Sequence, residues 1–91
     1  MSKKSILFIV NPISGTGRKG VLYDLIRKHI DGEKYDYTVA HTKYAGHATE
    51  LTNQAVEEGK DIVIAVGGDG TINEIARALR HTNTALGIIP D

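Results

Sequence analysis

The sequence predicts an α/β domain of three layers, in which helices cover both faces of an open parallel sheet and the elements follow the order βαβαβαβ. The first observation behind this is a pair of unbroken apolar runs at residues 5–10 and 62–66, typical of parallel strands buried on both faces. The second is that apolar residues recur at intervals of three and four between such runs, which indicates amphipathic helices. Strands joined through helices run parallel, because each crossover returns the chain to the same end of the sheet.

The first half of the chain predicts a strand, a helix and a second strand. The strand at residues 5–10 is followed by residues 11–17, NPISGTG, which carry Asn-Pro, a serine and two glycines and predict a loop. Residues 18–31 predict a helix, with Gly32 as the residue just beyond its C-cap. The apolar face of this helix contains Val21, Leu22, Leu25, Ile26 and Ile30. Apolar and polar residues alternate over residues 35–40, which predicts a strand at the edge of the sheet.

The second half continues the same alternation. After a loop at residues 42–46, residues 47–58 predict a helix that Gly59 ends. The apolar stripe of this helix consists of Ala48, Leu51, Thr52 and Ala55. Ile72, Ile75, Ala76 and Leu79 form the apolar face of a third helix. Residues 85–89, ALGII, predict a fourth short strand.

Two glycine-bearing loops follow the first and third predicted strands. In open parallel sheets, ligands bind beyond the carboxyl ends of the strands, at the point where the strand order reverses. The order 2-1-3-4 would bring both loops to one crevice, so this is the order that we expect.

Composition limits the function classes. The chain has 91 residues, enough for one small domain, and its formal net charge is zero, so nothing points to nucleic acid as a partner. Cysteine is absent, which excludes disulfides and thiolate metal sites and is compatible with the cytoplasm, where we expect the protein. No segment approaches the length of a transmembrane helix.

The third strand runs into a glycine-rich loop and then a helix. Gly67, Gly68 and Gly70 permit positive φ and a close approach of the backbone, and a helix N-terminus adds N–H groups and a partial positive charge. Thr71 stands where an N-cap is expected, and Glu74 three residues later completes a capping-box pattern. Together these features predict a phosphate-binding site.

Asp69 is out of place in a loop that attracts anions, because its carboxylate should repel phosphate. A divalent cation would resolve this, since Mg²⁺ is commonly held by one or two carboxylates together with substrate phosphates. The alternative is that the glycines and Asp69 simply form a tight turn. The strand before the loop and the capped helix after it favour the phosphate interpretation.

The loop after the first strand is a second candidate phosphate site. Asn11, Ser14 and Gly15 offer an amide, a hydroxyl and backbone N–H groups, and Arg18 and Lys19 at the following helix start would suit a bound anion. The alternative is that Asn-Pro turns the chain and that both cations are solvated surface.

The same segment satisfies the dinucleotide pattern GxGxxG over residues 15–20. Four residues separate the first glycine from the strand, and the second strand ends in His-Thr-Lys at residues 41–43 without the acidic residue that would hold a ribose. Val21 follows the last glycine where a P-loop has Lys-Ser/Thr. Neither pattern is therefore the favoured interpretation.

Thr42 ends the second strand and offers a hydroxyl that could hydrogen-bond a nucleotide in the same crevice. His41 and His47 bracket the following loop but lack a third metal ligand at suitable spacing. We expect His47 near the start of the second helix as a capping or packing residue. No Ser-His-Asp or Cys-His arrangement supports acyl transfer.

Three motifs together resemble the catalytic domain of diacylglycerol kinases. They are NPISG at residues 11–15, Thr42 with GHATEL at residues 46–51, and VGGDGTINE at residues 66–74. Bacterial lipid kinases and sphingosine and ceramide kinases share this domain, and NAD kinases and phosphofructokinases are more distant relatives through GGDG. The resemblance implies a Rossmann-like domain and an ATP-dependent transfer of the γ-phosphoryl group to a lipid hydroxyl.

Carried to this sequence, the resemblance implies three groups of site residues. Asn11, Ser14 and Gly15 would lie on the nucleotide phosphates, Thr42 would contact the nucleotide, and Gly67, Gly68, Gly70 and Thr71 would form the nucleotide loop with Asn73 nearby. Asp69 would be the catalytic residue and would be tied to Mg²⁺ and the transferring phosphate. Phosphoryl transfer depends mainly on positioning and charge neutralisation, which these groups can supply.

The resemblance also implies a larger parent protein. Family members continue into a β-sandwich that supplies the lipid contacts and the general base, so we expect residues 1–91 to be a truncated nucleotide-binding domain that is inactive alone. The parent would be a transferase of phospholipid biosynthesis, with peripheral membrane contact through the missing part. Two alternatives stay open: a kinase of a soluble acceptor such as NAD, and a non-catalytic α/β module that forms a homodimer through its open sheet edge.

Overall fold

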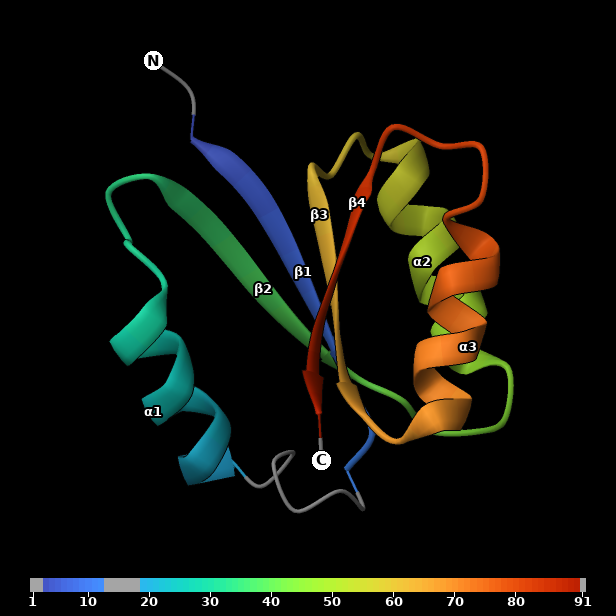
Figure 1. The fold of residues 1–91 in the computed structure, drawn as a ribbon, viewed down its shortest axis with the longest axis horizontal. Coiled ribbons are helices and arrows are strands. Elements are labelled where there is room, and N and C mark those ends of the chain that lie inside the picture. Colours follow the sequence, from blue (N-terminus) through green and yellow to red (C-terminus); the bar gives the residue numbers. More distant parts are fainter. Residues whose placement is uncertain (1–2, 13–18, 91) are drawn as a thin grey trace.

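The structure is a computed structural model that describes residues 3–12 and 19–90. Over these ranges the chain forms four strands and three helices in the expected alternation: β1 (Lys4–Val10), α1 (Lys19–His29), β2 (Tyr35–His41), α2 (His47–Glu57), β3 (Ile62–Gly67), α3 (Asp69–Ala78) and β4 (Ala85–Pro90). All neighbouring strands pair in parallel, and their order is β2-β1-β3-β4 (Figure 1). The predicted strand order is therefore confirmed.

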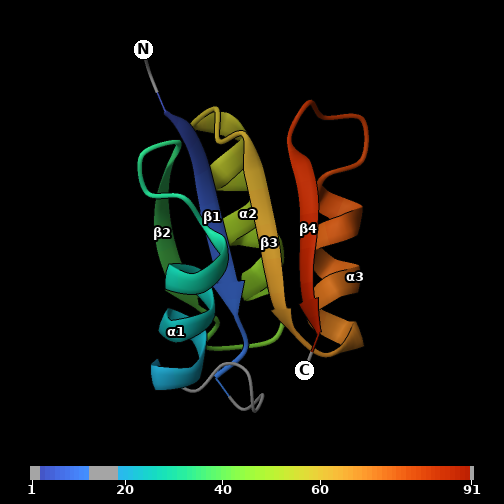
Figure 2. The same cartoon turned by 60° about the vertical axis from the view of Figure 1, so that its left-hand side comes forward.

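Helices cover both faces of the sheet. Helix α1 lies on one face, and α2 and α3 lie side by side on the other (Figures 1 and 2). Because successive side chains of a strand point to opposite faces, the sheet divides the apolar residues into two cores. The core under α1 contains Ile6, Phe8, Val10, Leu22, Ile26 and Val66. The core under α2 and α3 contains Leu7, Ile9, Ala48, Ala55, Val63, Ala65, Ile75 and Leu79. The three-layer prediction is confirmed.

The central pairing of β1 with β3 is held at its start by two residues far apart in the sequence. The Ser5 backbone N–H donates to the Asp61 carboxylate at 2.8 Å, and the Asp61 N–H donates to the Ser5 carbonyl at 3.1 Å. Each residue therefore gives the other one donor and one acceptor. This exchange fixes the register in which Ile6 pairs with Ile62 and Val10 with Val66.

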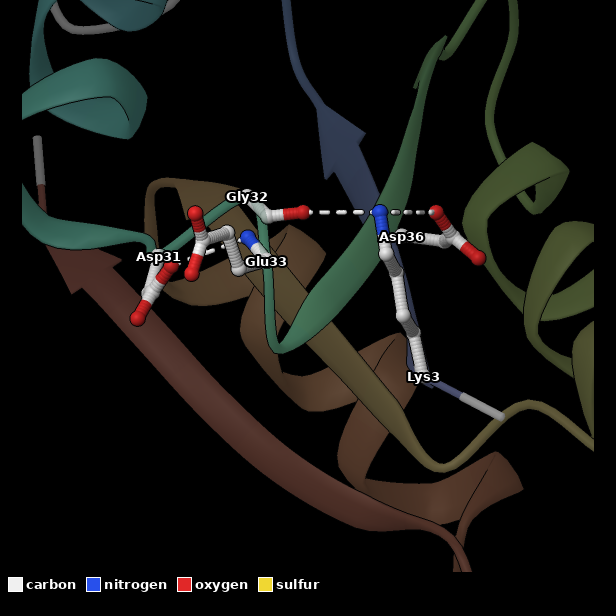
Figure 3. Close-up of polar contacts among 5 residues, drawn as sticks. All are labelled: Lys3, Asp31, Gly32, Glu33 and Asp36. Atoms are coloured by element: carbon white, nitrogen blue, oxygen red, sulfur yellow. Dashed lines mark hydrogen bonds and ion pairs between the residues drawn. The ribbon is translucent and has the colours of Figure 1, made fainter. Parts of the chain in front are cut away.

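The turn from α1 to β2 is tied to the first strand (Figure 3). The Lys3 ammonium donates to the Gly32 carbonyl at 2.9 Å and lies 3.7 Å from the Asp36 carboxylate. Within the turn, the Asp31 carboxylate accepts a hydrogen bond from the Glu33 N–H at 2.9 Å. The amino end of β2 is thus held beside the amino end of β1.

Helix α1 differs from its prediction at its end and on its apolar face. It ends at His29, and Gly32 is not a left-handed residue beyond its C-cap, because the side chain of Asp31 forms the turn instead. Val21, expected on the apolar face, is 46% exposed, because it lies at the margin of a stripe centred on Leu22 and Ile26.

Helix α2 ends at Glu57, one residue before the predicted end, and Gly59 follows its C-cap Glu58 with a φ of +77°, as the stop predicted at this glycine requires. The Gly59 N–H donates to the Val56 carbonyl at 3.1 Å, and the Lys60 N–H donates to the Ala55 carbonyl at 3.0 Å. These two bonds form a Schellman motif, in which glycine avoids the steric cost of the left-handed conformation.

The two edges of the sheet are β2 and β4. On β2, Asp36, Tyr37 and Thr38 are exposed, as the predicted edge strand requires. Single-helix cover on the α1 face leaves an apolar hollow of about 420 Å³ between α1 and β4. In the part of the chain that the structure describes, no helix is both long and apolar enough to cross a membrane.

Candidate nucleotide site

The carboxyl ends of the strands meet at one edge of the sheet, at the bottom of Figure 1. Two backbone hydrogen bonds join the chain just beyond them: the Asn11 N–H donates to the Val66 carbonyl at 3.0 Å, and the Thr42 N–H donates to the Val10 carbonyl at 2.9 Å. The segments after β1, β2 and β3 therefore start side by side. Between them lies a pocket of about 300 Å³, lined by Asn11, Pro12, Thr42, Lys43, Tyr44, Ala45, Thr71 and Glu74.

Gly67 is buried next to Asn11 and Thr71, two of the residues that line the pocket. Its φ of +152° is one that side-chain-bearing residues rarely adopt, and a Cβ placed on it would lie 3.1 Å from the Asn11 Cβ and 3.5 Å from the Thr71 Oγ1. Glycine is required here for both conformation and space. Its lack of a side chain lets the loops after β1 and β3 approach each other.

The start of α3 corrects two expectations. The helix begins at Asp69 with Gly68 as its N-cap, and Thr71 lies inside the first turn, so the capping box does not form. The extended backbone of Gly68, with φ −87° and ψ −176°, allows this earlier start, and the Ile72 N–H closes the first turn on the Gly68 carbonyl at 3.2 Å. Positive φ is found at Gly67 alone among the three loop glycines.

Among the described residues, no neighbour requires glycine at position 68 or 70 for space. A Cβ added at either would meet no atom of the described residues within 4 Å, and both positions are exposed. Asp69 between them is exposed as well. Helices leave the backbone N–H groups of their first turn without helical partners, and no side chain of residues 68–70 other than that of Asp69 stands over this turn of α3.

We expect Gly70→Ala to stabilise the fold and weaken nucleotide binding. Alanine lowers the cost of ordering a helical residue, so the free energy of unfolding should rise by about 0.5 kcal/mol. The same methyl group would cover the N-terminal turn of α3 and lower affinity for ATP. Urea unfolding and calorimetric titration on one preparation would check both, and unchanged ATP affinity would contradict the second part.

The predicted site residues fall into three groups. Asn11, Thr42 and Thr71 line the pocket together, and Gly67 is buried next to Asn11 and Thr71. Gly68, Asp69, Gly70 and Asn73 are exposed at the adjoining start of α3 and are not among the lining residues. Ser14 and Gly15 lie outside the described residues, as does Arg18.

Comparison with known proteins identifies the family. The model of the diacylglycerol kinase catalytic domain matches residues 5–91. The chain belongs to this diacylglycerol kinase family. Over 97% of its length it is 34% identical to a diacylglycerol kinase of Staphylococcus aureus, and over 89% it is 38% identical to a ceramide kinase of Oryza sativa.

Solved structures agree. A crystal structure of a diacylglycerol kinase from Bacillus anthracis matches 99% of this chain with a TM-score of 0.73 and 30% identity. The chain spans 34% of that protein, 29% of the Staphylococcus aureus kinase and 14% of the rice kinase. The similarity thus concerns one part of longer proteins.

Within this diacylglycerol kinase fold, the loop after β2 supplies pocket residues that the sequence did not single out: Lys43, Tyr44 and Ala45. The Tyr44 ring stacks on the His47 imidazole with centroids 4.4 Å apart, and its hydroxyl donates to the Glu50 carboxylate. That hydrogen bond raises the pKa of the Tyr44 phenol above its ordinary value, with smaller effects from desolvation and from the Glu50 charge. The sequence could have indicated Lys43, Tyr44 and Ala45 as pocket residues, because they directly follow Thr42.

Glu74 is a further lining residue, which the sequence suggested only as part of a capping box. Its carboxylate accepts a hydrogen bond from the Thr49 hydroxyl at 3.5 Å, which connects α3 to the start of α2. Residues three apart on a helix share a face, so the position of Glu74 relative to Thr71 could have predicted its place in the pocket.

The described residues hold no group of three or more His, Cys, Asp or Glu side chains that could by itself bind a metal ion. Asp69 is a single exposed carboxylate. Such a residue fits Mg²⁺ as one ligand beside the oxygens of a bound phosphate, the usual mode for this ion.

Proposed function

We propose that this chain is the nucleotide-binding part of an ATP-dependent lipid kinase, which transfers the γ-phosphoryl group of ATP to a lipid hydroxyl. The observation that carries the proposal is the pocket formed by the loops after β1 and β2 and by Thr71 and Glu74 of α3, beside the glycine-flanked N-terminus of that helix at Gly68 and Gly70. Helix N-termini with little side-chain cover attract phosphate, because their N–H groups and dipole favour negative charge.

The chemistry that this site would serve is a simple exchange of bonds. The lipid hydroxyl oxygen forms a bond to the γ-phosphorus, the bond between that phosphorus and the β,γ-bridging oxygen breaks, and ADP and a proton are released. The chain would position the phosphates through Asn11, Thr71 and the first turn of α3. Positioning and charge neutralisation are the main demands of phosphoryl transfer, so no covalent role for a side chain is needed.

The lipid class comes from the relatives. The similar proteins are named as a diacylglycerol kinase and a ceramide kinase, and both names specify a lipid acceptor that carries a hydroxyl group. We therefore propose a hydroxyl-bearing lipid of the diacylglycerol type as acceptor. We favour this lipid acceptor over a soluble acceptor such as NAD.

Magnesium would bind with ATP. Asp69 would supply one oxygen ligand, the phosphates would supply others, and the ion would offset the repulsion between this carboxylate and the nucleotide. When bound, Mg²⁺ neutralises charge on the transferring phosphoryl group.

The test is a calorimetric titration of the chain with ATP, with and without Mg²⁺, with NAD as a parallel ligand. We expect Asp69→Asn to remove the magnesium-dependent part of ATP affinity, because its amide keeps the shape but loses the charge. Glu57→Gln is the matched control, since it removes the same charge from an exposed site at the end of α2. Binding of NAD in preference to ATP, or equal magnesium dependence in Asp69→Asn, would contradict the proposal.

A further inference from the structure

We propose that His47 is a positioning residue for this site: its unprotonated Nδ1 holds residues 42–46 in place as a wall of the pocket. Protonation of the ring would release that wall and weaken nucleotide binding. The inference rests on the proposed function, because it concerns the same pocket.

The contact that carries the inference is a single hydrogen bond. The Lys43 backbone N–H donates to the His47 Nδ1 at 3.0 Å. Only an unprotonated ring nitrogen can accept, since both nitrogens of an imidazolium are donors. The bond therefore assigns the proton of the neutral ring to Nε2, and it is lost when the ring gains a second proton.

The remaining contacts of the loop explain why this bond matters. The His47 N–H donates to the Tyr44 carbonyl at 3.1 Å, the two rings stack at an angle of 16°, and the Tyr44 hydroxyl is anchored on Glu50. Gly46, with a φ of +87°, makes the tight turn that folds the loop back onto α2. Residues 43 and 44 of the loop are thus both held by His47.

The loop so held is part of the pocket itself. Thr42, Lys43, Tyr44 and Ala45 all line the pocket opposite Thr71 and Glu74 of α3. The His47 bond is made to the middle of this wall, at the backbone of Lys43. Its loss would let the wall move relative to α3 without changing any residue that lines the pocket.

The charged and titratable residues on the segments that neighbour the ring are His41 at the end of β2, Lys43 and Tyr44 in the loop, Glu50 on α2 and Glu74 on α3. Carboxylates, ammonium groups and phenols ordinarily keep their charge state between about pH 5.5 and 8, whereas imidazoles change theirs. The ATP terminal phosphate also titrates in this range, so the test needs a control that lacks only the His47 ring.

His47→Asn is that control. Its Oδ1 is bonded to Cγ as Nδ1 is, so it can accept from the Lys43 N–H, but it does not titrate. ATP affinity is measured by calorimetry for both proteins at about pH 8 and pH 5.5. From pH 8 to pH 5.5 we expect the affinity of the native chain to fall about two- to tenfold further than that of His47→Asn, the effect of one hydrogen bond.

An NMR titration of the Lys43 amide, in the absence of nucleotide, reads the hydrogen bond separately. We expect the Lys43 resonance to shift with pH in the native chain and to stay fixed in His47→Asn. A fixed Lys43 resonance in the native chain would overturn the inference, and so would a parallel fall of ATP affinity in both proteins. If neither protein binds ATP at either pH, the proposed function fails and the inference fails with it. A pH-dependent Lys43 resonance would in that case show only that the hydrogen bond between Lys43 and His47 exists.

Discussion

Gly67→Ala should both destabilise the domain and disrupt nucleotide binding. Alanine at position 67 would have to adopt a backbone conformation that residues with side chains rarely adopt, and its methyl group would lie 3.1 Å from the Asn11 Cβ. We expect a loss of about 1–3 kcal/mol in the free energy of unfolding, the usual cost of such backbone strain. ATP affinity should fall at least about tenfold, equivalent to about 1.4 kcal/mol, because Asn11 and Thr71 flank the substituted position. Urea unfolding and calorimetry measure the two effects.

Gly68→Ala is the matched control for stability. Gly68 is extended, and a Cβ there meets no described atom within 4 Å, so only its N-cap preference changes, at a cost of about 1 kcal/mol or less. Equal unfolding midpoints for Gly67→Ala and the native chain would show that the loop tolerates a side chain at position 67.

Phe8→Ala should have the largest effect on stability. Phe8 is 1% exposed in the core under α1, and its ring makes an edge-to-face contact with Tyr37 at a centroid distance of 5.9 Å. Truncation of a buried Phe costs about 3–5 kcal/mol, which is a large share of the roughly 5–15 kcal/mol that stabilises a typical domain. We expect the variant to be largely unfolded at temperatures where the native chain is folded, as measured by far-UV circular dichroism.

Phe8→Leu separates volume from the aromatic contact. Leucine keeps much of the buried apolar volume, so this variant should stay folded with a smaller loss. A native-like melting temperature for Phe8→Ala would mean that the core under α1 contributes little to the stability of the fold.

Sequence patterns predicted the sheet because its two central strands are apolar on both faces. Apolar and polar residues do not alternate over residues 5–10 and 62–66, because helices cover both faces of β1 and β3. The strand order was predicted because the order 2-1-3-4 brings both glycine-bearing loops to one crevice, and the structure has this order.

Local backbone geometry was less predictable. The pattern Thr-x-x-Glu fits a capping box, but packing of Thr71 against Gly67 and the extended backbone of Gly68 start α3 at Asp69 instead. At the end of α1, a hydrogen bond from the Glu33 N–H to the Asp31 carboxylate forms the turn, and Gly32 does not adopt the expected left-handed conformation. Each outcome depends on side-chain contacts that periodicity does not encode.

The site was predictable in part. Strand-end position identified Asn11 and Thr42, which line the pocket with Thr71. Tyr44 was missed because its place in the pocket depends on how the loop after β2 folds back onto α2. Glu74 lies one turn after Thr71 on the same helix face, and it was interpreted only as part of a capping box.

The strand order also has a consequence for folding kinetics. The pocket lies across the pairing of β1 with β3, and the residues that fix this pairing, Ser5 and Asp61, are 56 positions apart. Strands this far apart in the sequence lose the entropy of closing a long loop before their contacts can stabilise the pairing, so parallel sheets form slowly. Asn11, which follows β1, and Thr71, which follows β3, come together only once these strands have paired, and binding competence should therefore appear together with the completed sheet.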